Sequence, residues 1–258
     1  MIMSWFKRRR RRALLASPVP SSWDPHLANL PFLETLDDAE RRRLVADARV
    51  IIDEKNWEGC GGQEMTEEVQ VLVAVQAALL LLNVRHDYYR RTRSILVYPS
   101  TFVLPEGVER GGVRGERGTP VLGLAESGGP VVLAWDSVQQ GVASGRDGRN
   151  VVYHEFAHKL DMLDHVADGT PRLDSREKLD EWVRVMTREF EALRVDDEKG
   201  RRTLLDTYGA TNPAEFFAVA TECFFEQPRL MRDRHGDLYR ILSDFYKQDP
   251  ASRPRAAR

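Results

Sequence analysis

Apolar residues recur every three or four positions in several stretches of the chain, a spacing that favours amphipathic α-helices. One such stretch, VQVLVAVQAALLLLN, follows Thr66, Glu67 and Glu68, which are typical of a helix start. This helix is apolar on most sides, so we expect it to be buried. The other predicted helices cover residues 36–54, 151–163, 175–193, 213–226 and 236–246.

Short runs rich in β-branched and aromatic residues predict strands between these helices. They are SILVYPSTFVLP, TPVLGLA and GPVVLAWDSV, which cover residues 94–105, 119–125 and 129–138. The composition of NWEGCGGQEMT predicts a glycine-rich turn over residues 56–66, and residues 111–119 and 195–202 are predicted loops. Helices that flank one small mixed sheet predict an α+β fold. If residues 131–135 form an edge strand, they can receive an extended peptide by strand addition.

The composition is that of a soluble globular protein with a sizeable core: 258 residues, 42% hydrophobic, 30% charged, with a net charge of −2. Two cysteines, Cys60 and Cys223, are too few for a disulfide framework, so we expect a reducing, cytoplasmic compartment. No apolar run reaches the roughly 18 residues that a membrane helix needs. The near-neutral charge gives no reason to expect direct binding of nucleic acid.

The first residues, MIMSWFKRRRRRALLASPVP, depart from this balance. They contain six consecutive basic residues, of which Lys7 is the first and Arg12 the last, and the apolar run that follows is too short for a secretory signal. We predict a disordered tail and linker over residues 1–30, one folded domain over 31–250 and a tail over 251–258. The alternative for the basic run is a weak electrostatic tether to an anionic surface.

The motif HEFAH places His154 and His158 four residues apart, with Glu155 between them. Residues at this spacing share one face of a helix, so both imidazoles can bind one metal ion. The arrangement suits a tetrahedral zinc with three protein ligands and a water, from which Glu155 takes a proton. Asn150 offers a helix cap before the motif. The alternative is an ordinary packing helix with two incidental histidines.

Asp164 is one candidate for the third ligand, because it lies six residues beyond His158. That geometry needs the helix to turn at Asp161, where a glycine is usual. Asp161 is itself a candidate for a carboxylate that hydrogen-bonds a ligating imidazole and fixes its tautomer. An exposed helical aspartate is the alternative.

Two glutamates of the predicted helix 213–226 also compete for the third position. Glu215 and Glu222 are seven residues apart, which is about two helical turns, so both can face the HEFAH helix. Glu215 has a purely structural interpretation as well. Asn212 as N-cap, Pro213 at the first position and Glu215 at the third would form a capping box.

HEFAHKLD together with YGATNPAEFFAVATECFF resembles the Mlc titration factor family of zinc peptidases. The second segment also resembles lethal-factor-type metalloproteases, whose catalytic domains are gluzincins. NWEGCGG and the apolar helix that ends in LLLLN fit the first family, so the similarity covers most of residues 30–250. The resemblance implies a zincin-like metallopeptidase domain with HExxH on the active-site helix and one Zn²⁺ per chain.

The resemblance also implies roles for individual residues. His154, His158 and Glu215 would bind the zinc, Glu155 would be the general base, and Tyr208 would donate a hydrogen bond to the oxyanion. The implied activity is aminopeptidase-like cleavage of short peptides. Because the family is named for titrating Mlc, a DNA-binding repressor of sugar-uptake genes, the resemblance also implies an Mlc-like partner. A regulatory protein that mainly sequesters such a repressor, with peptidase activity secondary, is the alternative function.

Overall fold

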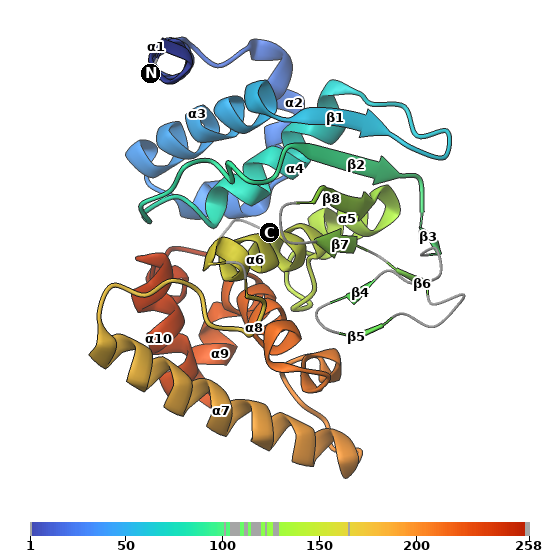
Figure 1. Cartoon of the computed structure of the whole chain (residues 1–258), viewed down its shortest axis with the longest axis vertical. Helices are drawn as coiled ribbons and strands as arrows, with labels where there is room; N and C mark the ends of the chain where they lie inside the picture. The colour runs from blue at the N-terminus through green and yellow to red at the C-terminus, as the bar shows by residue number, and fades with distance from the viewer. Residues whose placement is uncertain are drawn as a thin grey trace.

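The structure is a computed structural model, and it describes residues 2–100, 102–103, 109–110, 113–114, 120–121, 123–125, 129–164 and 166–255. Helix α6 (Val151–Asp161), which carries the HEFAH motif, crosses the middle of the molecule. A small sheet with helices α3 (Asp38–Glu54) and α4 (Glu67–Leu79) lies on one side of α6 (Figure 1). Helices α7 (Arg176–Glu198), α8 (Pro213–Glu226) and α10 (Gly236–Tyr246) lie on the other side.

These six helices confirm the predictions from apolar spacing, and polar side chains fix where several of them begin. Thr66 accepts a hydrogen bond from the backbone N–H of Val69, and Ser175 accepts one from that of Lys178. Such caps satisfy N–H groups that have no partner within the helix. In the described part of the chain, four further helices were not predicted: α1 (Ile2–Ala16), α2 (Asp24–Leu27), α5 (Trp135–Ser144) and α9 (Pro228–Arg234). Four 3₁₀ turns were not predicted either: η1 (Ser21–Trp23), η2 (Pro31–Thr35), η4 (Thr207–Ala210) and η5 (Pro250–Ser252). The turn η3 (Met162–Asp164) contains the last two residues of the helix predicted over 151–163.

The main sheet is small and mixed, as expected for the α+β class. Its strand order is β1-β2-β8-β7, with bounds Asn56–Gly59, Ser94–Tyr98, Val131–Ala134 and Gly123–Ala125. The first three strands are parallel, and β7 is antiparallel to β8. Two short antiparallel pairs accompany it: β3 (Phe102–Val103) with β6 (Pro120–Val121), and β4 (Glu109–Arg110) with β5 (Val113–Arg114).

The structure corrects several boundaries. Residues 56–59, predicted as part of a turn, form β1 because they pair with β2, a contact that no local pattern shows. The strand predicted over residues 129–138 ends at Ala134, and Trp135 begins α5. Because β8 lies between β2 and β7, it is internal, and the prediction of strand addition at residues 131–135 is wrong. Helix α7 continues through residues 195–198, which were predicted as loop, and most of the loop at 111–119 lies outside the described residues.

The core is built around α4, which is buried on every side from Val71 to Leu79, as its sequence predicted. One polar residue of this helix, Gln76, is buried as well and accepts a hydrogen bond from the Asn150 side chain at 2.7 Å. A buried amide needs such a partner, because losing hydration without replacement is costly. The bond therefore ties α4 to the residue that precedes α6.

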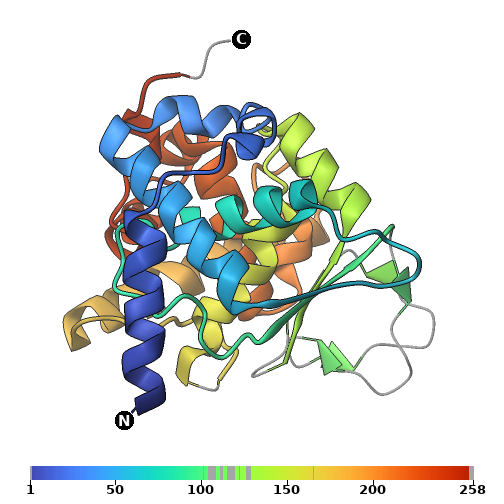
Figure 2. The same cartoon turned by 90° about the horizontal axis from the view of Figure 1, so that it is seen from above.

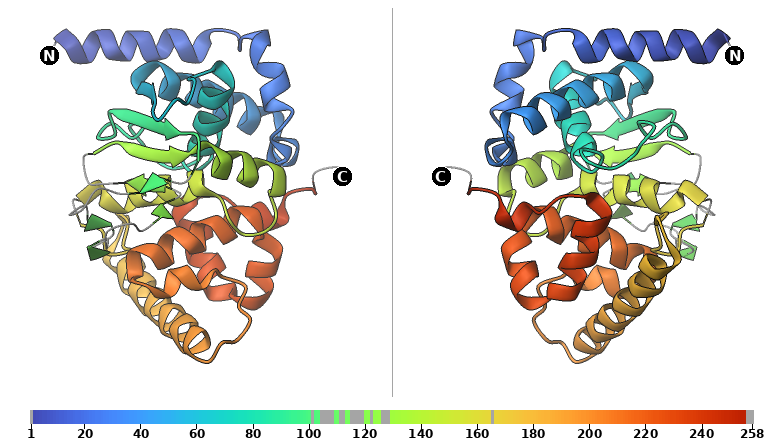
Figure 3. Two further views of the ribbon diagram at one scale, coloured as in Figure 1. Left: turned by 90° about the vertical axis from the view of Figure 1, so that its right-hand side faces the viewer. Right: turned by 90° about the vertical axis from the view of Figure 1, so that its left-hand side faces the viewer.

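The basic N-terminal segment differs from the predicted disordered tail. It forms α1, which packs along the outside of α3, and Figures 2 and 3 show it at the margin of the molecule. Arg11 pairs with Glu54 and Asp87, and Lys7 also pairs with Glu54. These partners are distant in sequence, so the basic run alone could not indicate an ordered helix.

The division of the chain at residues 30 and 250 stays a prediction. Among the described residues, no helix is both long and apolar enough to cross a membrane.

Candidate metal centre

Asn150 fixes the register of α6 and hence of the HEFAH motif. Its Oδ1 accepts hydrogen bonds from the backbone N–H groups of Val152 and Tyr153, both at 3.1 Å, so the predicted N-cap is confirmed. The helix then places the two histidines one turn apart on the face that packs against α8. His154 and His158 are both buried, which is unusual for histidine and requires partners.

The start of α8 supplies the first partner. Asn212 caps this helix by accepting from the backbone N–H of Glu215 at 3.0 Å, as the capping-box interpretation predicted. The Glu215 carboxylate nevertheless reaches across to α6. Its Oε2 lies 2.9 Å from Nε2 of His154 and 3.3 Å from Nε2 of His158. Only the Asn212 half of the predicted capping box is therefore seen in these contacts: Asn212 caps the backbone of Glu215, while the Glu215 carboxylate faces the two histidines.

The three side chains have the geometry of a metal site. His154, His158 and Glu215 are all buried, and their ligand atoms lie within 4.8 Å of one another. The two imidazole Nε2 atoms are 3.2 Å apart. Ligands bound at about 2.0–2.1 Å to a tetrahedral zinc lie roughly 3.3 Å from each other, close to the three observed separations. The donor set, two imidazoles and a carboxylate, is one that such an ion accepts.

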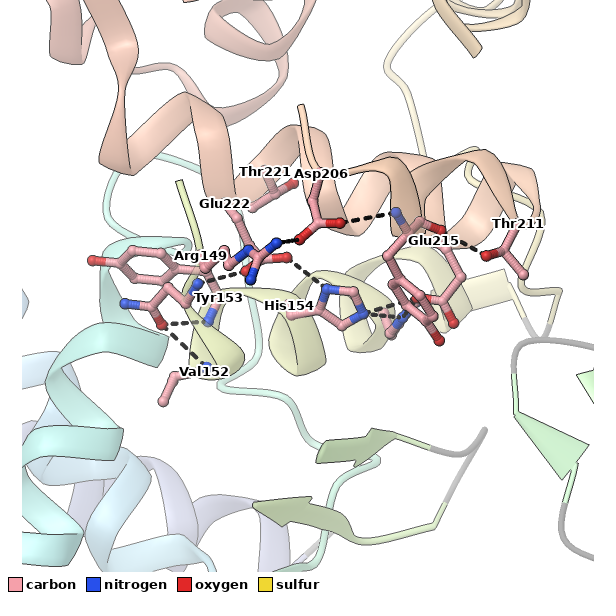
Figure 4. A network of polar contacts seen from close by, with 12 residues as sticks. Arg149, Val152, Tyr153, His154, Asp206, Thr211, Glu215, Thr221 and Glu222 are labelled. Carbon is pink, nitrogen blue, oxygen red and sulfur yellow. Dashed lines mark hydrogen bonds and ion pairs between the residues drawn. The ribbon is translucent and has the colours of Figure 1, made fainter. Parts of the chain in front are cut away.

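Glu222, the other candidate ligand, is placed differently. Its Oε1 lies 2.7 Å from Nδ1 of His154, and its Oε2 accepts a short hydrogen bond from the backbone N–H of Asn150. Figure 4 shows His154 between Glu222 on one side and Glu215 on the other. Glu222 thus contacts the ring nitrogen that faces away from the three-residue cluster. A carboxylate in this position fixes the tautomer and the orientation of a ligating imidazole.

The sequence offered Asp161 as a candidate for this orienting role, with an exposed helical aspartate as the alternative, and the structure supports neither, because Asp161 is buried. Asp161 Oδ2 accepts from the backbone N–H of Gly169 at 2.9 Å, so it holds the chain that follows α6. Among the described residues, neither Asp161 Oδ1 nor Nδ1 of His158 has a hydrogen-bond partner. Asp164 is not supported as a ligand either, because helical structure continues from α6 through η3 to Asp164, whereas that geometry needs the helix to stop and turn at Asp161. The side chain of Asp164 lies outside the described residues.

The electrostatics of the cluster favour a positive charge. Burial alone would lower the pKa of His154, but Glu222 and Glu215 outweigh it and raise that pKa to about 10. Burial alone would raise the pKa of Glu215, but hydrogen bonds from His154 and His158 outweigh it and hold that pKa well below its usual range. The carboxylates therefore form a buried, negatively charged environment suited to a cation.

Two further residues of the predicted set lie beside this cluster. Glu155 follows His154 on α6 and is buried. The ring centroid of Tyr208 lies 6.0 Å from that of the His154 imidazole, and the side chain is 37% exposed. Tyr208 is held in η4 because Asp206 accepts from its backbone N–H at 2.9 Å, while Asp206 also pairs with Arg149 at 2.7 Å, as Figure 4 shows.

Comparison with known proteins agrees with this site. Residues 5–247 match the family described as glucose-regulated metallo-peptidase M90. An uncharacterized protein of Synechocystis sp. is 36% identical over 244 residues, which cover 93% of this chain and 89% of that protein. Mlc titration factor A of Serratia proteamaculans is 34% identical over 90% of this chain and 89% of its own length. Mlc titration factor A of Edwardsiella ictaluri is 34% identical over 89% of this chain and 88% of its length.

Proposed function

The chain belongs to the M90 family of glucose-regulated metallopeptidases, and we propose that it is a zinc-dependent peptidase of the gluzincin type. The ligands in this proposal are His154, His158 and Glu215. One observation carries it: three buried side chains from α6 and α8 bring their ligand atoms together within 4.8 Å. An ordinary packing interface does not bury two histidines against a carboxylate in this way, because each group loses hydration.

In the proposed reaction, bound zinc would polarise the scissile carbonyl and lower the pKa of a water molecule. Glu155 takes the proton of the attacking water and delivers it to the leaving amine, which agrees with its buried position beside His154. Glu222 accepts a hydrogen bond from Nδ1–H of His154, which leaves the lone pair of Nε2 for the zinc ion when it is bound. Tyr208 donates a hydrogen bond to the oxyanion of the tetrahedral intermediate.

Short peptides are the proposed substrates, with an aminopeptidase-like preference. The support for this preference is the resemblance of the HEFAH and AEFFA segments to the peptidase family. The aminopeptidase preference can be tested separately from the peptidase activity itself. Cleavage of peptides with a free amino terminus but not of their acetylated counterparts is the expected pattern, and equal cleavage of both would contradict the aminopeptidase preference alone.

A second function is binding of an Mlc-like repressor. Its support is that relatives 30–34% identical to this chain carry the name Mlc titration factor A. Sequestration of a repressor needs a binding surface but does not require an intact metal site. The two functions therefore respond differently to a substitution at Glu155. A variant that binds the repressor but does not cleave peptides would separate them.

The test of the peptidase is a comparison of purified wild type, Glu155→Gln and Tyr208→Phe on short peptides, each with its zinc content measured. We expect Glu155→Gln to lower kcat about 10²–10⁴-fold, since it removes the general base but no ligand. Tyr208→Phe should lower kcat about 10²-fold. Zinc content should not change in either variant. The matched control is Glu198→Gln, at the end of α7, which should leave kcat unchanged. Full activity of Glu155→Gln would contradict the mechanism.

A further inference from the structure

Helix α1 leaves large apolar side chains in contact with solvent. Trp5 is 55% exposed and Phe6 is 59% exposed, and their rings touch edge to face with centroids 5.0 Å apart. Among residues 5–16 of α1, the side chains of Arg11 and Leu14 are half-buried, and all the others are exposed. Exposed apolar patches rimmed by polar residues are a feature of protein and membrane interaction sites.

The basic residues of α1 fall into two groups. Lys7, Arg10 and Arg11 pair with acidic residues of α3 and of the segment after α4, and so hold the helix in place. Arg8, Arg9 and Arg12 are exposed, and no ion pair joins them to any described residue. Their charge is therefore available to a partner.

The second group shares a face with the aromatic residue Trp5. Positions 5, 8, 9 and 12 are separated by three, four and seven residues, which places them on one side of a helix. The Arg9 guanidinium lies over the Trp5 ring, 5.6 Å from its centroid. Arg11 faces the rest of the protein, so the opposite side of the helix, which carries residues 5, 8, 9 and 12, faces outward. It combines three arginines with one tryptophan, and Phe6 adjoins it.

We propose that this face of α1 docks the protein on the surface of an anionic lipid bilayer. The arginines would bind lipid phosphates while Trp5 and Phe6 insert at the headgroup level, where aromatic rings are favoured. Stable attachment at a membrane surface generally needs two signals, and this helix supplies both charge and apolar area. A nucleic-acid duplex would use the arginines but gives no reason to expose an aromatic pair at one end of the helix, and a single strand, whose bases could stack on the rings, is distinguished by the test below.

The position of α1 in the molecule is compatible with such docking. It lies at the outer margin, beyond α3, whereas the candidate metal centre lies between α6 and α8 (Figures 1 and 3). A bilayer that contacts α1 would therefore not need to contact the His154 cluster. The proposal is independent of the proposed peptidase function.

The experiment is co-sedimentation of the full chain with lipid vesicles. Vesicles of phosphatidylcholine are compared with vesicles of equal parts phosphatidylcholine and phosphatidylglycerol. We expect wild type to bind the anionic vesicles, and to lose that binding in high salt. The variants Arg8→Gln/Arg9→Gln/Arg12→Gln and Trp5→Ser/Phe6→Ser should each bind at least about tenfold more weakly. Both change exposed side chains, so their melting temperatures should match that of wild type.

The matched control removes the same charge from other exposed sites, in the variant Arg176→Gln/Arg202→Gln/Arg232→Gln. It should bind the anionic vesicles as wild type does. The proposal is overturned if wild type stays in the supernatant with anionic vesicles or binds neutral vesicles equally well. It is also overturned if the control loses as much binding as the α1 variants. Binding of a DNA or RNA oligonucleotide through Arg8, Arg9 and Arg12, with no binding of the anionic vesicles, would assign this face to nucleic acid instead.

Discussion

At the scale of single residues, His154 shows how the site depends on both ring nitrogens. Nε2 faces Glu215 at 2.9 Å and Nδ1 faces Glu222 at 2.7 Å, so α8 contacts the imidazole from both sides. The pair His154 and His158 could be predicted from sequence, because helix geometry alone brings positions four apart onto one face. The different roles of Glu215 and Glu222 could not, since both have the right periodicity and the choice depends on how α8 lies against α6.

Glu226, one turn beyond Glu222, provides a prediction about pH and stability. Burial raises the pKa of its carboxyl to about 8, although the Asn150 side chain donates a hydrogen bond to it at 3.1 Å. In the unfolded chain the pKa is 4.5, so between these values the folded protein retains a proton that the unfolded chain has released. Stability must therefore fall as pH rises through this window, by up to about 1.4 kcal/mol per pH unit.

The variant Glu226→Gln tests this directly. Glutamine keeps an acceptor for Asn150 but does not titrate, so its melting temperature should fall less than that of wild type between pH 5 and pH 8. Melting temperatures are measured by circular dichroism across this range. Glu64→Gln changes an exposed glutamate and should retain the pH dependence of wild type. An unchanged pH dependence in Glu226→Gln would contradict the assignment.

At the scale of elements, local signals located the helices better than the strands. Helices α8 and α10 begin and end as predicted, because Asn212, Pro213 and the apolar spacing are all local features. Strand β1 was missed because its four residues carry no strong alternation of their own and are ordered by pairing with β2. The strand at 131–134 was found, but its internal place in the sheet depends on the whole topology.

Gly169 joins the elements that carry the site, and we predict that it tolerates no side chain. Its backbone N–H donates to Asp161 at the end of α6, and its carbonyl accepts from the Trp182 indole of α7 at 3.0 Å. Its φ is +77°, and an added Cβ would lie 2.3 Å from the carbonyl oxygen of Pro213, at the start of α8. Gly169→Ala should therefore both strain the backbone and push α8 away from α6.

The comparison for this prediction is Gly200→Ala. Gly200 has a similar φ of +61° but open space around it, so the substitution there costs about 1–2 kcal/mol of backbone strain alone. We expect Gly169→Ala to lower the free energy of unfolding by at least about 2 kcal/mol more than Gly200→Ala, as measured by urea denaturation. Equal losses in the two variants would show that the contact with Pro213 does not constrain this junction.

At the scale of the whole molecule, α6 lies between a sheet layer and a helical layer, and the site forms where the second layer meets it. The α+β class could be predicted, since strand-rich and helix-rich stretches are segregated along the sequence. The ordered position of α1 could not, because it depends on Asp53, Glu54 and Asp87, which are brought together only in the folded protein. Long-range ion pairs of this kind leave no periodic signal in the basic segment itself.

The most direct test of the account is the zinc content of the purified protein, measured by elemental analysis in wild type, Glu215→Ala and Glu222→Ala. We predict close to one zinc per chain in wild type and its loss in Glu215→Ala, which removes a ligand. Glu222→Ala should still bind zinc, about ten to a hundred times more weakly, because it frees the far nitrogen of His154. No zinc in wild type after zinc is added back, or unchanged zinc affinity in Glu215→Ala, would contradict the proposed metal centre.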